Sequence, residues 1–318
     1  MGVAEKMRLV LLSHGADDFA PLQTACTRAG HEPVAYVSAR SPRPAGRADA
    51  ATRSAISGVI DAVPSGTDLL LPARAAHLER ALAGYRPDLL VCYCFPWKLP
   101  ASVLRIARLG AINVHSSLLP RYRGPIPVHW AIRNGDREIG VTVHRMDEDF
   151  DTGPVVIQKG GIPVAEDAVA ERLFGHVAAA VPDLLADALA LVGDGHEGVR
   201  QDSSAASYAG WMEREFLAVD WTRTADEVHN QVRTFRFATS GTHGPVADVN
   251  GDRLEVLRTR TEPSDGIRVE CADGPIWIVD CMAPHDHSAE DFPWIRRTPP
   301  GGEPVSSMPQ SAHLTEGS

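Results

Sequence analysis

Asn113 and His115 stand two positions apart at the carboxyl end of a short apolar run, residues 110–114. Such a run predicts a buried strand, and side chains two positions apart on a strand project from the same face. An amide donor beside an imidazole suits a carbonyl oxygen that becomes negatively charged under attack. The imidazole can also exchange a proton with the attacking group. We therefore expect these two residues to act on one carbonyl group.

A carboxylate-rich loop follows at residues 146–153 (MDEDFDTG). The run from Asp147 to Asp149 is typical of a solvated turn. Asp151 stands before Thr-Gly and an extended segment, and a buried carboxylate there would raise the pKa of His115 toward neutrality. Residue type and spacing alone leave a structural role open for Asn113, His115 and Asp151.

Apolar strands and helices alternate around these residues. The predicted strands are residues 8–13, 31–38, 88–94 and 110–114, and the predicted helices are residues 19–30, 100–108, 127–134 and 166–192. This alternation indicates an α/β fold with a doubly wound, Rossmann-like parallel sheet, whose strands bind ligands at their carboxyl ends. Residues 140–146 and 154–159 predict a hairpin-like pair added to that sheet. Residues 41–53 are polar and predict a loop.

The chain length predicts two domains. Residues 1–206 would form the catalytic domain and residues 207–217 a linker, with an OB-like β domain at residues 218–287. Residues 288–318 are rich in Pro, Ser, Gly and charge, which predicts a disordered tail.

Two local signals support the β domain. Thr224 precedes a helical pattern, with Glu227 three residues later, which predicts a capping box. Asn250-Gly251 and Asp273-Gly274 stand between apolar runs and predict hairpin turns.

Composition excludes several classes of protein. Among 318 residues, 31 Lys+Arg against 41 Asp+Glu give a net charge of -10, which disfavours a protein that mainly holds nucleic acid. The five cysteines lack paired metal or redox spacing, which fits a reducing cytoplasm. Glu5, Lys6 and Arg8 interrupt any N-terminal signal sequence, and no stretch approaches the roughly 20 apolar residues of a membrane span. A cytoplasmic location is expected.

Two kinds of site are excluded on residue pattern. The first turn carries Gly15 alone, with Asp17 and Asp18 beside it, so the G-x-G-x-x-G fingerprint of dinucleotide-binding dehydrogenases is missing. His285 and His287 form a pair of metal-ligand type, but no third ligand has suitable spacing. No metal is expected.

Several spaced motifs together resemble the 10-formyltetrahydrofolate-dependent formyltransferases. They are residues 113–120 (NVHSSLLP), residues 122–124 (YRG) and residues 151–153 (DTG). The resemblance also includes residues 43–47 (RPAGR), residues 139–142 (IGVT), and residues 219–221 and 228–233 at the start of the family's OB-like domain.

The resemblance implies direct formyl transfer from 10-formyltetrahydrofolate to an amine. Asn113 and protonated His115 would stabilise the oxyanion, and Asp151 would orient His115 or pass protons through water. The folate would lie at the sheet switch point, held largely by backbone groups and without a metal. The residues implied to contact it are Cys94, Phe95, Trp97, Leu99, Ser117, Leu118, Leu119, Pro120, Met146 and Asp147.

Some details of this site stay open. Residues 95–97 (FPW) are bulkier than the family pattern, which leaves the loop shape in question, and Trp97 fits a core position as well as a folate contact. Arg121 and Arg123 fit either an anionic substrate group or a solvated face.

The acceptor amine is the remaining question, and methionyl-tRNA is the family's commonest acceptor with two domains. Residues 43–47 favour tRNA, but residues 48–52 (ADAAT) replace the basic run expected next. Residues 218–287 carry twelve acidic residues against seven arginines and no lysine, a net charge of -5, which is unfavourable for binding phosphates. A small-molecule amine, such as an amino sugar nucleotide or a hydroxyornithine-type siderophore precursor, is therefore favoured over methionyl-tRNA. A non-catalytic folate- or nucleotide-binding module is the alternative of another class.

Overall fold

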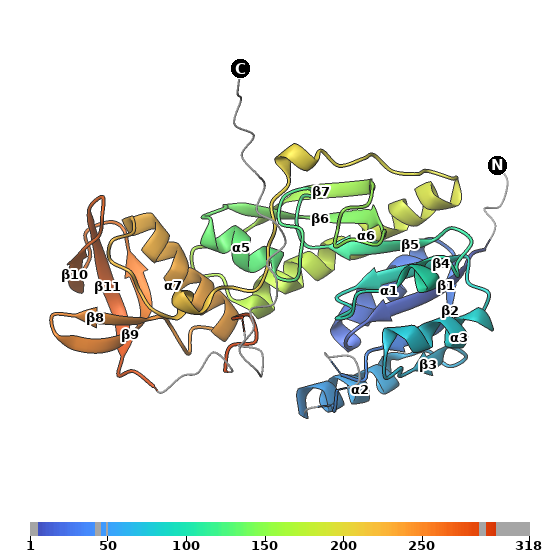
Figure 1. Ribbon diagram of the computed structural model, residues 1–318, viewed down its shortest axis with the longest axis horizontal. Helices are drawn as coiled ribbons and strands as arrows, with labels where there is room; N and C mark the ends of the chain where they lie inside the picture. Colours follow the sequence, from blue (N-terminus) through green and yellow to red (C-terminus); the bar gives the residue numbers. More distant parts are fainter. Residues whose placement is uncertain (1–5, 42–45, 49, 286–290, 297–318) are drawn as a thin grey trace, which may run out of the picture.

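The computed structural model describes residues 6–41, 46–48, 50–285 and 291–296. Its larger sheet has seven strands in the order β3-β2-β1-β4-β5-β6-β7 (Figure 1). The strands are β1 (Arg8–Ser13), β2 (Glu32–Ser38), β3 (Asp68–Leu70), β4 (Leu89–Tyr93), β5 (Ala111–His115), β6 (Glu138–Arg145) and β7 (Val155–Pro163). The first five are parallel to one another, and β6 runs antiparallel to both of its neighbours, β5 and β7. The predicted doubly wound sheet with an added pair of strands is confirmed.

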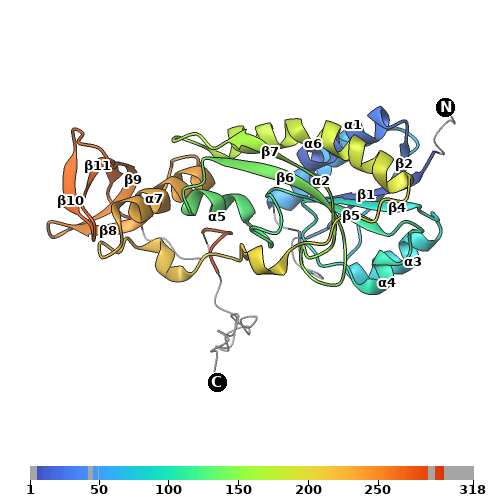
Figure 2. The same ribbon diagram turned by 90° about the horizontal axis from the view of Figure 1, so that it is seen from above.

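Helices cover both faces of this sheet, as continuous apolar strands require. Seen from above, α1 (Ala16–Arg28) and α6 (Ala170–Gly193) lie along one face, and α3 (Leu78–Ala83) and α4 (Ala101–Leu104) along the other (Figure 2). The first pair packs on Leu9, Leu11 and Val91. The second pair packs on the alternate positions of the same strands.

Helix α6 is long and apolar enough to cross a membrane by length and composition alone. It is amphipathic, however, and Leu173, Val177, Val181 and Leu185 along one side are buried in the core beside α1 and β7. This pattern is that of a core helix.

The predicted loop at residues 41–53 is wrong at its end, because α2 (Ala50–Ala62) begins at residue 50. Val59 is the one fully buried apolar side chain of α2, so its burial pattern carries little helical periodicity. The three-residue edge strand β3 was missed for a similar reason, since it is short and partly exposed. Residues 43–45 of the RPAGR segment lie outside the described residues.

The second domain contains a four-stranded antiparallel sheet in the order β10-β11-β9-β8. Its elements are α7 (Ala225–Thr239), β8 (Val246–Val249), β9 (Asp252–Arg260), β10 (Ile267–Glu270) and β11 (Pro275–Met282). The predicted capping box of Thr224 and Glu227 is present, and α7 packs through Val232 on the sheet. Asn250 and Gly251 form the predicted turn, both with positive φ.

Two segments connect this domain to the first. The chain passes through η2 (Ser203–Ala205) and η3 (Arg214–Leu217) into α7, while α5 (Pro127–Arg133) lies between the two sheets (Figure 1). Residues 291–296 then run beside the linker: the Met212 amide donates to the Trp294 carbonyl at 2.9 Å, and the Arg296 amide donates to the Met212 carbonyl at 2.7 Å.

The expected tail from residue 288 is therefore wrong for residues 291–296. Phe292, Trp294 and Ile295 are buried against Phe216 and Phe235. The prediction failed because it used the average composition of the segment, which is polar, although these three side chains are apolar. Residues 288–290 and 297–318 lie outside the described residues.

Candidate active site

The core of the site is set by the register of two antiparallel strands. Asn113 of β5 pairs with His144 of β6, and His115 pairs with Thr142. Alternate residues on a strand share a face, so all four side chains stand on the same face of the sheet. His144 is a site residue that sequence reasoning missed. The alternating pattern of residues 140–146 carried the signal, but only the register places His144 opposite Asn113.

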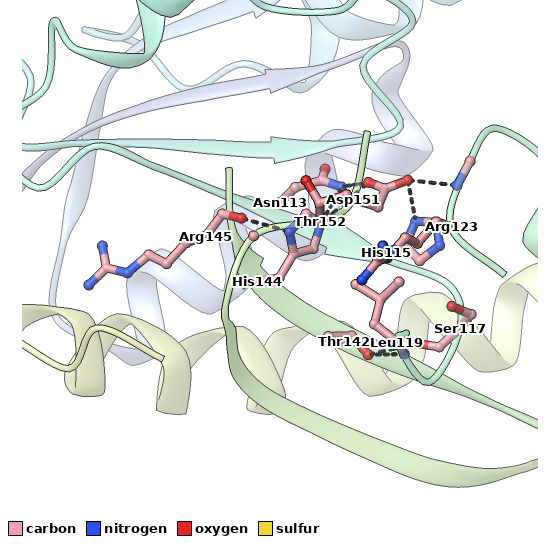
Figure 3. A network of polar contacts seen from close by, with 12 residues as sticks. Asn113, His115, Ser117, Leu119, Arg123, Thr142, His144, Arg145, Asp151 and Thr152 are labelled. Atoms are coloured by element: carbon pink, nitrogen blue, oxygen red, sulfur yellow. Dashed lines mark hydrogen bonds and ion pairs between the residues drawn. The ribbon is translucent and has the colours of Figure 1, made fainter. Parts of the chain in front are cut away.

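Asp151 reaches this face from the loop between β6 and β7 (Figure 3). Its Oδ1 atom lies 3.4 Å from the Asn113 Nδ2 atom and 3.4 Å from the His144 Nε2 atom. Its Oδ2 atom lies 3.6 Å from the His115 Nδ1 atom and accepts a hydrogen bond from the Gly124 amide at 2.8 Å. The structure thus brings together the three residues expected to be catalytic and adds His144.

Hydrogen bonds to carbonyl groups indicate the tautomer of each imidazole, because a carbonyl can only accept. The His115 Nε2 atom donates to the Tyr122 carbonyl at 2.8 Å, and the His144 Nδ1 atom donates to the Arg145 carbonyl at 2.8 Å. The neutral His115 ring then has its basic nitrogen, Nδ1, facing Asp151. The neutral His144 ring has Nε2 as an acceptor for the Asn113 amide, 3.2 Å away.

Burial dominates the electrostatics of this cluster. Burial lowers the pKa of His115 below its ordinary value, and the charge of Asp151 only partly opposes this. Asp151 does act to raise the pKa of His115, as expected, but burial outweighs this effect and the net shift is downward. Burial also acts to raise the pKa of Asp151, but its interactions with His115 and with the Gly124 amide act to lower it, and the net pKa is about 2. At neutral pH an ionised carboxylate faces a neutral imidazole.

The Asp151 loop has a tightly determined backbone. Asp151 itself has a φ of 56°, in the left-handed region. Gly153 leaves no room for a side chain, because a Cβ atom there would lie 1.9 Å from the Arg145 carbonyl oxygen. The Gln201 amide donates to the carbonyls of Asp151 and Gly153 at 2.9 and 2.7 Å. Gln201 was also missed by sequence reasoning, since it lies 50 residues from Asp151.

This arrangement coincides with a match to a known family. The family model described as formyl transferase matches residues 7–189, more than half of the chain. The chain belongs to the formyl transferase family. The resemblance drawn from residues 113–124 and 151–153 is confirmed.

Curated relatives extend the similarity over the second domain. A methionyl-tRNA formyltransferase of Anaeromyxobacter dehalogenans is 35% identical over an alignment of 292 residues, and the match covers 86% of this chain and 91% of the relative. A methionyl-tRNA formyltransferase of Pseudomonas paraeruginosa is 35% identical over an alignment of 271 residues, and the match covers 80% of this chain and 84% of the relative. The similarity therefore includes both domains.

Solved structures share the fold at lower identity. WlaRD, a sugar 3N-formyl transferase determined in the presence of dTDP and 5-N-formyl-THF, has a TM-score of 0.60 at 15% identity, over 88% of this chain and all of that one. HypX of Aquifex aeolicus in complex with tetrahydrofolic acid has a TM-score of 0.56 at 20% identity, over 87% of this chain and 44% of that one. Together they confirm the predicted fold class.

Residues 117–120 are one segment expected to contact folate, and they form a loop beside His115 that hydrogen bonds hold to Thr142. The Leu119 amide donates to the Thr142 hydroxyl at 3.2 Å, which in turn donates to the Ser117 carbonyl at 2.7 Å. Leu118 is partly exposed and lies over Gly140, where a Cβ atom would approach it to 2.4 Å. The peptide bond to Pro120 is cis.

Residues 94–99, the second expected segment, are largely anchored by their side chains. The Trp97 indole is buried and donates to the Ser41 carbonyl at 2.9 Å, and Phe95 meets it edge-on at 5.5 Å. Leu99 is buried in the core. Cys94 is exposed and has a φ of 53°. Trp97 thus takes the core position that the sequence left open, and contacts from this segment to a ligand would come from the backbone.

Residues 146–150, the third expected segment, touch the second. The Lys98 ammonium lies 4.0 Å from Asp149 and 5.2 Å from the centre of the Phe150 ring. Asp147 is exposed and shapes the turn, because its carboxylate accepts from the Thr152 hydroxyl at 2.7 Å. The Met146 amide donates to the Ala111 carbonyl at 2.8 Å. The loops that follow β4 and β6 are therefore in contact with each other.

The two arginines left open by the sequence make internal contacts. Arg121 binds Asp136 at 3.0 Å and the Tyr122 hydroxyl at 2.8 Å. Arg123 donates two hydrogen bonds to the Gln201 side chain, at 2.8 and 3.0 Å. Arg123 thereby orients the residue that holds the Asp151 backbone.

Proposed function

We propose that the chain transfers the formyl group of 10-formyltetrahydrofolate to an amine, with Asn113, His115 and Asp151 as catalytic residues. The observation that carries this proposal is the convergence of the three side chains within 3.6 Å on one face of β5. The backbones of residues 94–99, 117–120 and 146–147 would hold the folate. The five cysteines are free thiols, which fits our proposal of a cytoplasmic enzyme.

The chemistry assigns one role to each catalytic residue. The amine attacks the formyl carbon, and the Asn113 amide donates to the oxygen that becomes negative. The His115 Nδ1 atom accepts the proton released by the amine, and the Asp151 carboxylate stabilises the resulting imidazolium. The bond between the formyl carbon and N10 then breaks, N10 receives the proton, and the products are a formamide and tetrahydrofolate.

Both protons of the Asn113 amide are engaged before substrate arrives, one with His144 and one with Asp151. The formyl oxygen would replace one of these partners as its negative charge grows. Since the exchange is most favourable when that oxygen is an anion, Asn113 would act mainly on the transition state.

We propose the α-amino group of methionyl-tRNA as the acceptor. The support is that methionyl-tRNA formyltransferases are 35% identical to this chain over a length that includes the second domain. An acceptor with a large, extended shape would give both domains a role in binding it.

A small-molecule amine is the second candidate, and the charge of the second domain favours it. A cavity of about 1210 Å³ lies between α5 and α7. Three of its arginines are bound to carboxylates of the same chain: Arg133 to Glu213, Arg233 to Glu166, and Arg223 to Glu227. Phosphates would have to displace these carboxylates, which weakens electrostatic binding of a nucleic acid.

One set of assays separates the acceptors. The purified chain is given 10-formyltetrahydrofolate with methionyl-tRNA, an amino sugar nucleotide or hydroxyornithine, and kcat/KM is measured at rising salt. Efficient formylation of methionyl-tRNA whose KM rises steeply with salt supports the tRNA acceptor. Efficient transfer to a small amine alone, with little salt dependence, would replace it with the second candidate. Unchanged activity in Asp151→Asn with every acceptor would contradict the proposed site.

A further inference from the structure

Glu255 is a fully buried carboxylate in the middle of the second sheet. It lies on β9, where it pairs with Val246 of β8 on one side and Met282 of β11 on the other. His243 precedes β8 by three residues and His285 follows β11 by three residues. Both histidines therefore stand just beyond the ends of the two neighbouring strands, and both imidazoles lie next to the Glu255 carboxylate.

The three side chains converge at short distances. The Nδ1 atom of His243 lies 3.2 Å from one carboxylate oxygen of Glu255, and the Nδ1 atom of His285 lies 3.1 Å from the other. One ligand atom from each residue lies within 4.8 Å of those of the other two. Among the described residues, no other group of three metal-ligating side chains meets this distance limit.

We propose that Glu255, His243 and His285 bind a divalent transition-metal ion of the zinc class. Imidazole nitrogen and carboxylate oxygen are the ligands that Zn²⁺ takes in proteins. Bonds of about 2.0 Å in tetrahedral geometry separate neighbouring ligand atoms by roughly 3.3 Å. Each Nδ1 atom already lies at about this distance from one carboxylate oxygen, so small side-chain movements would bring all three ligands around one ion.

The charge of Glu255 supports a cation at this position. A carboxylate removed from water needs a compensating charge or a full set of hydrogen bonds. The Gly244 amide supplies one hydrogen bond, at 3.0 Å. A divalent ion held between this carboxylate and the two imidazoles would add positive charge beside it.

The histidines differ in how firmly they are held. The backbone of His243 is fixed by Thr239, whose hydroxyl accepts from the His243 amide at 3.2 Å and donates to the His243 carbonyl at 3.0 Å. His285 has a side chain that is 52% exposed and follows the last strand, so it can adjust to an ion. Asp286 and His287, which come next in the sequence, lie outside the described residues.

Spacing in the sequence hides this site. Glu255 follows His243 by 12 residues and precedes His285 by 30, so the three belong to different elements. A bound ion would link the turn after α7, the central strand and the segment after β11. The His243 ring also contacts the Phe292 ring, at 6.2 Å, so the ion would stabilise the packing of residues 291–296.

The test uses the full chain, stripped of metal with a chelator and then titrated with ZnCl₂. We expect one zinc ion per chain and a rise in Tm on adding zinc. His285→Gln, a change at an exposed side chain, and Glu255→Gln are expected to lose both effects. His229→Ala is the matched control, because His229 contacts one carboxylate, Glu166, without a third ligand; it should bind zinc as the unchanged chain does.

Other outcomes overturn the proposal. If the stripped chain takes up no zinc and its Tm does not respond, the imidazoles are only hydrogen-bond partners of Glu255. If His285→Gln and Glu255→Gln both remain folded by circular dichroism and bind zinc as the unchanged chain does, the ion binds elsewhere. Neither result depends on formyl transfer.

Discussion

The His115 Nδ1 atom lies 3.6 Å from the Asp151 Oδ2 atom, inside a site from which solvent is largely excluded. Burial keeps the imidazole neutral, while the pKa of Asp151 is lowered to about 2. A proton that arrives on Nδ1 therefore completes an ion pair. The pair can accept a proton from the amine without a new charge being left alone in the protein interior.

The pH dependence of kcat/KM should reflect the protonation of His115 beside Asp151. A base must be neutral to accept a proton, so kcat/KM falls at pH values below the pKa of His115. Because that pKa is lowered, the acid limb should lie below the ordinary imidazole value of about 6.5. Steady-state rates between pH 5 and 8 measure it, and a limb above this value would contradict the assignment.

Asp151→Asn should lower kcat by about 10² or more, because the imidazolium loses its counter-charge. The same change removes the charge that raises the pKa of His115, so the acid limb should move to still lower pH. Asp149→Asn, in the same loop but exposed, is the control and should leave both quantities unchanged. A limb that moves to higher pH would show that Asp151 does not act on His115.

His115→Ala should also reduce kcat by about 10² while tetrahydrofolate still binds, since the imidazole acts on the reacting atoms. Equilibrium binding of tetrahydrofolate and single-turnover rates separate the two effects. His176→Ala, at an exposed position of α6, serves as the control. Near-normal turnover in His115→Ala would contradict the proposal that His115 is the base.

His144→Phe should lower kcat about tenfold with little change in KM for the folate. The change deletes the acceptor of the Asn113 amide, and one such hydrogen bond contributes about 1–1.5 kcal/mol. His144→Gln retains an acceptor and should recover part of the rate. Equal losses in the two variants would mean that His144 only fills space.

Gly153→Ala should displace the Asp151 loop, because the added methyl group would overlap the Arg145 carbonyl. A shift of about 1 Å in a catalytic group can reduce turnover by 10². Gly175→Ala is the control, since a Cβ atom there has open space in α6 and should stabilise the helix by about 0.5–1 kcal/mol. Turnover and urea denaturation of both variants test this, and full activity in Gly153→Ala would contradict it.

Trp294→Ala should reduce the free energy of unfolding by about 3–5 kcal/mol, because the indole is buried against Phe216, Phe235 and His129. Trp211→Ala, at a half-exposed position, should cause a smaller loss. If urea titrations show equal losses of unfolding free energy in the two variants, the side chains of residues 291–296 do not stabilise the protein as a buried core would.

Short-range signals in the sequence predicted most of the first domain. The apolar runs gave the strands because those strands are buried on both faces, and the two-residue spacing of Asn113 and His115 gave the shared face. His144, Gln201 and Glu255 were not recognised. Each depends on strand register or on a contact between distant segments, which no local pattern records.

The net direction of the pKa shift of His115 could not be predicted from the sequence either, because it depends on contacts formed only in the folded chain. The residue types correctly suggested an attractive partner in Asp151, but the depth of burial decides the net direction. Burial is set by Tyr122 and the surrounding loops, which close over the imidazole only in the folded chain.

Residues 291–296 lie beside the linker at Met212 and run parallel to it, and two backbone hydrogen bonds join the two segments. Trp294 contacts His129 of α5 and Phe235 of α7, so this segment packs against both domains and should resist a change in their relative placement. We therefore expect α5 and α7 to keep a fixed spacing, so that the pocket lined by residues of both helices keeps its width.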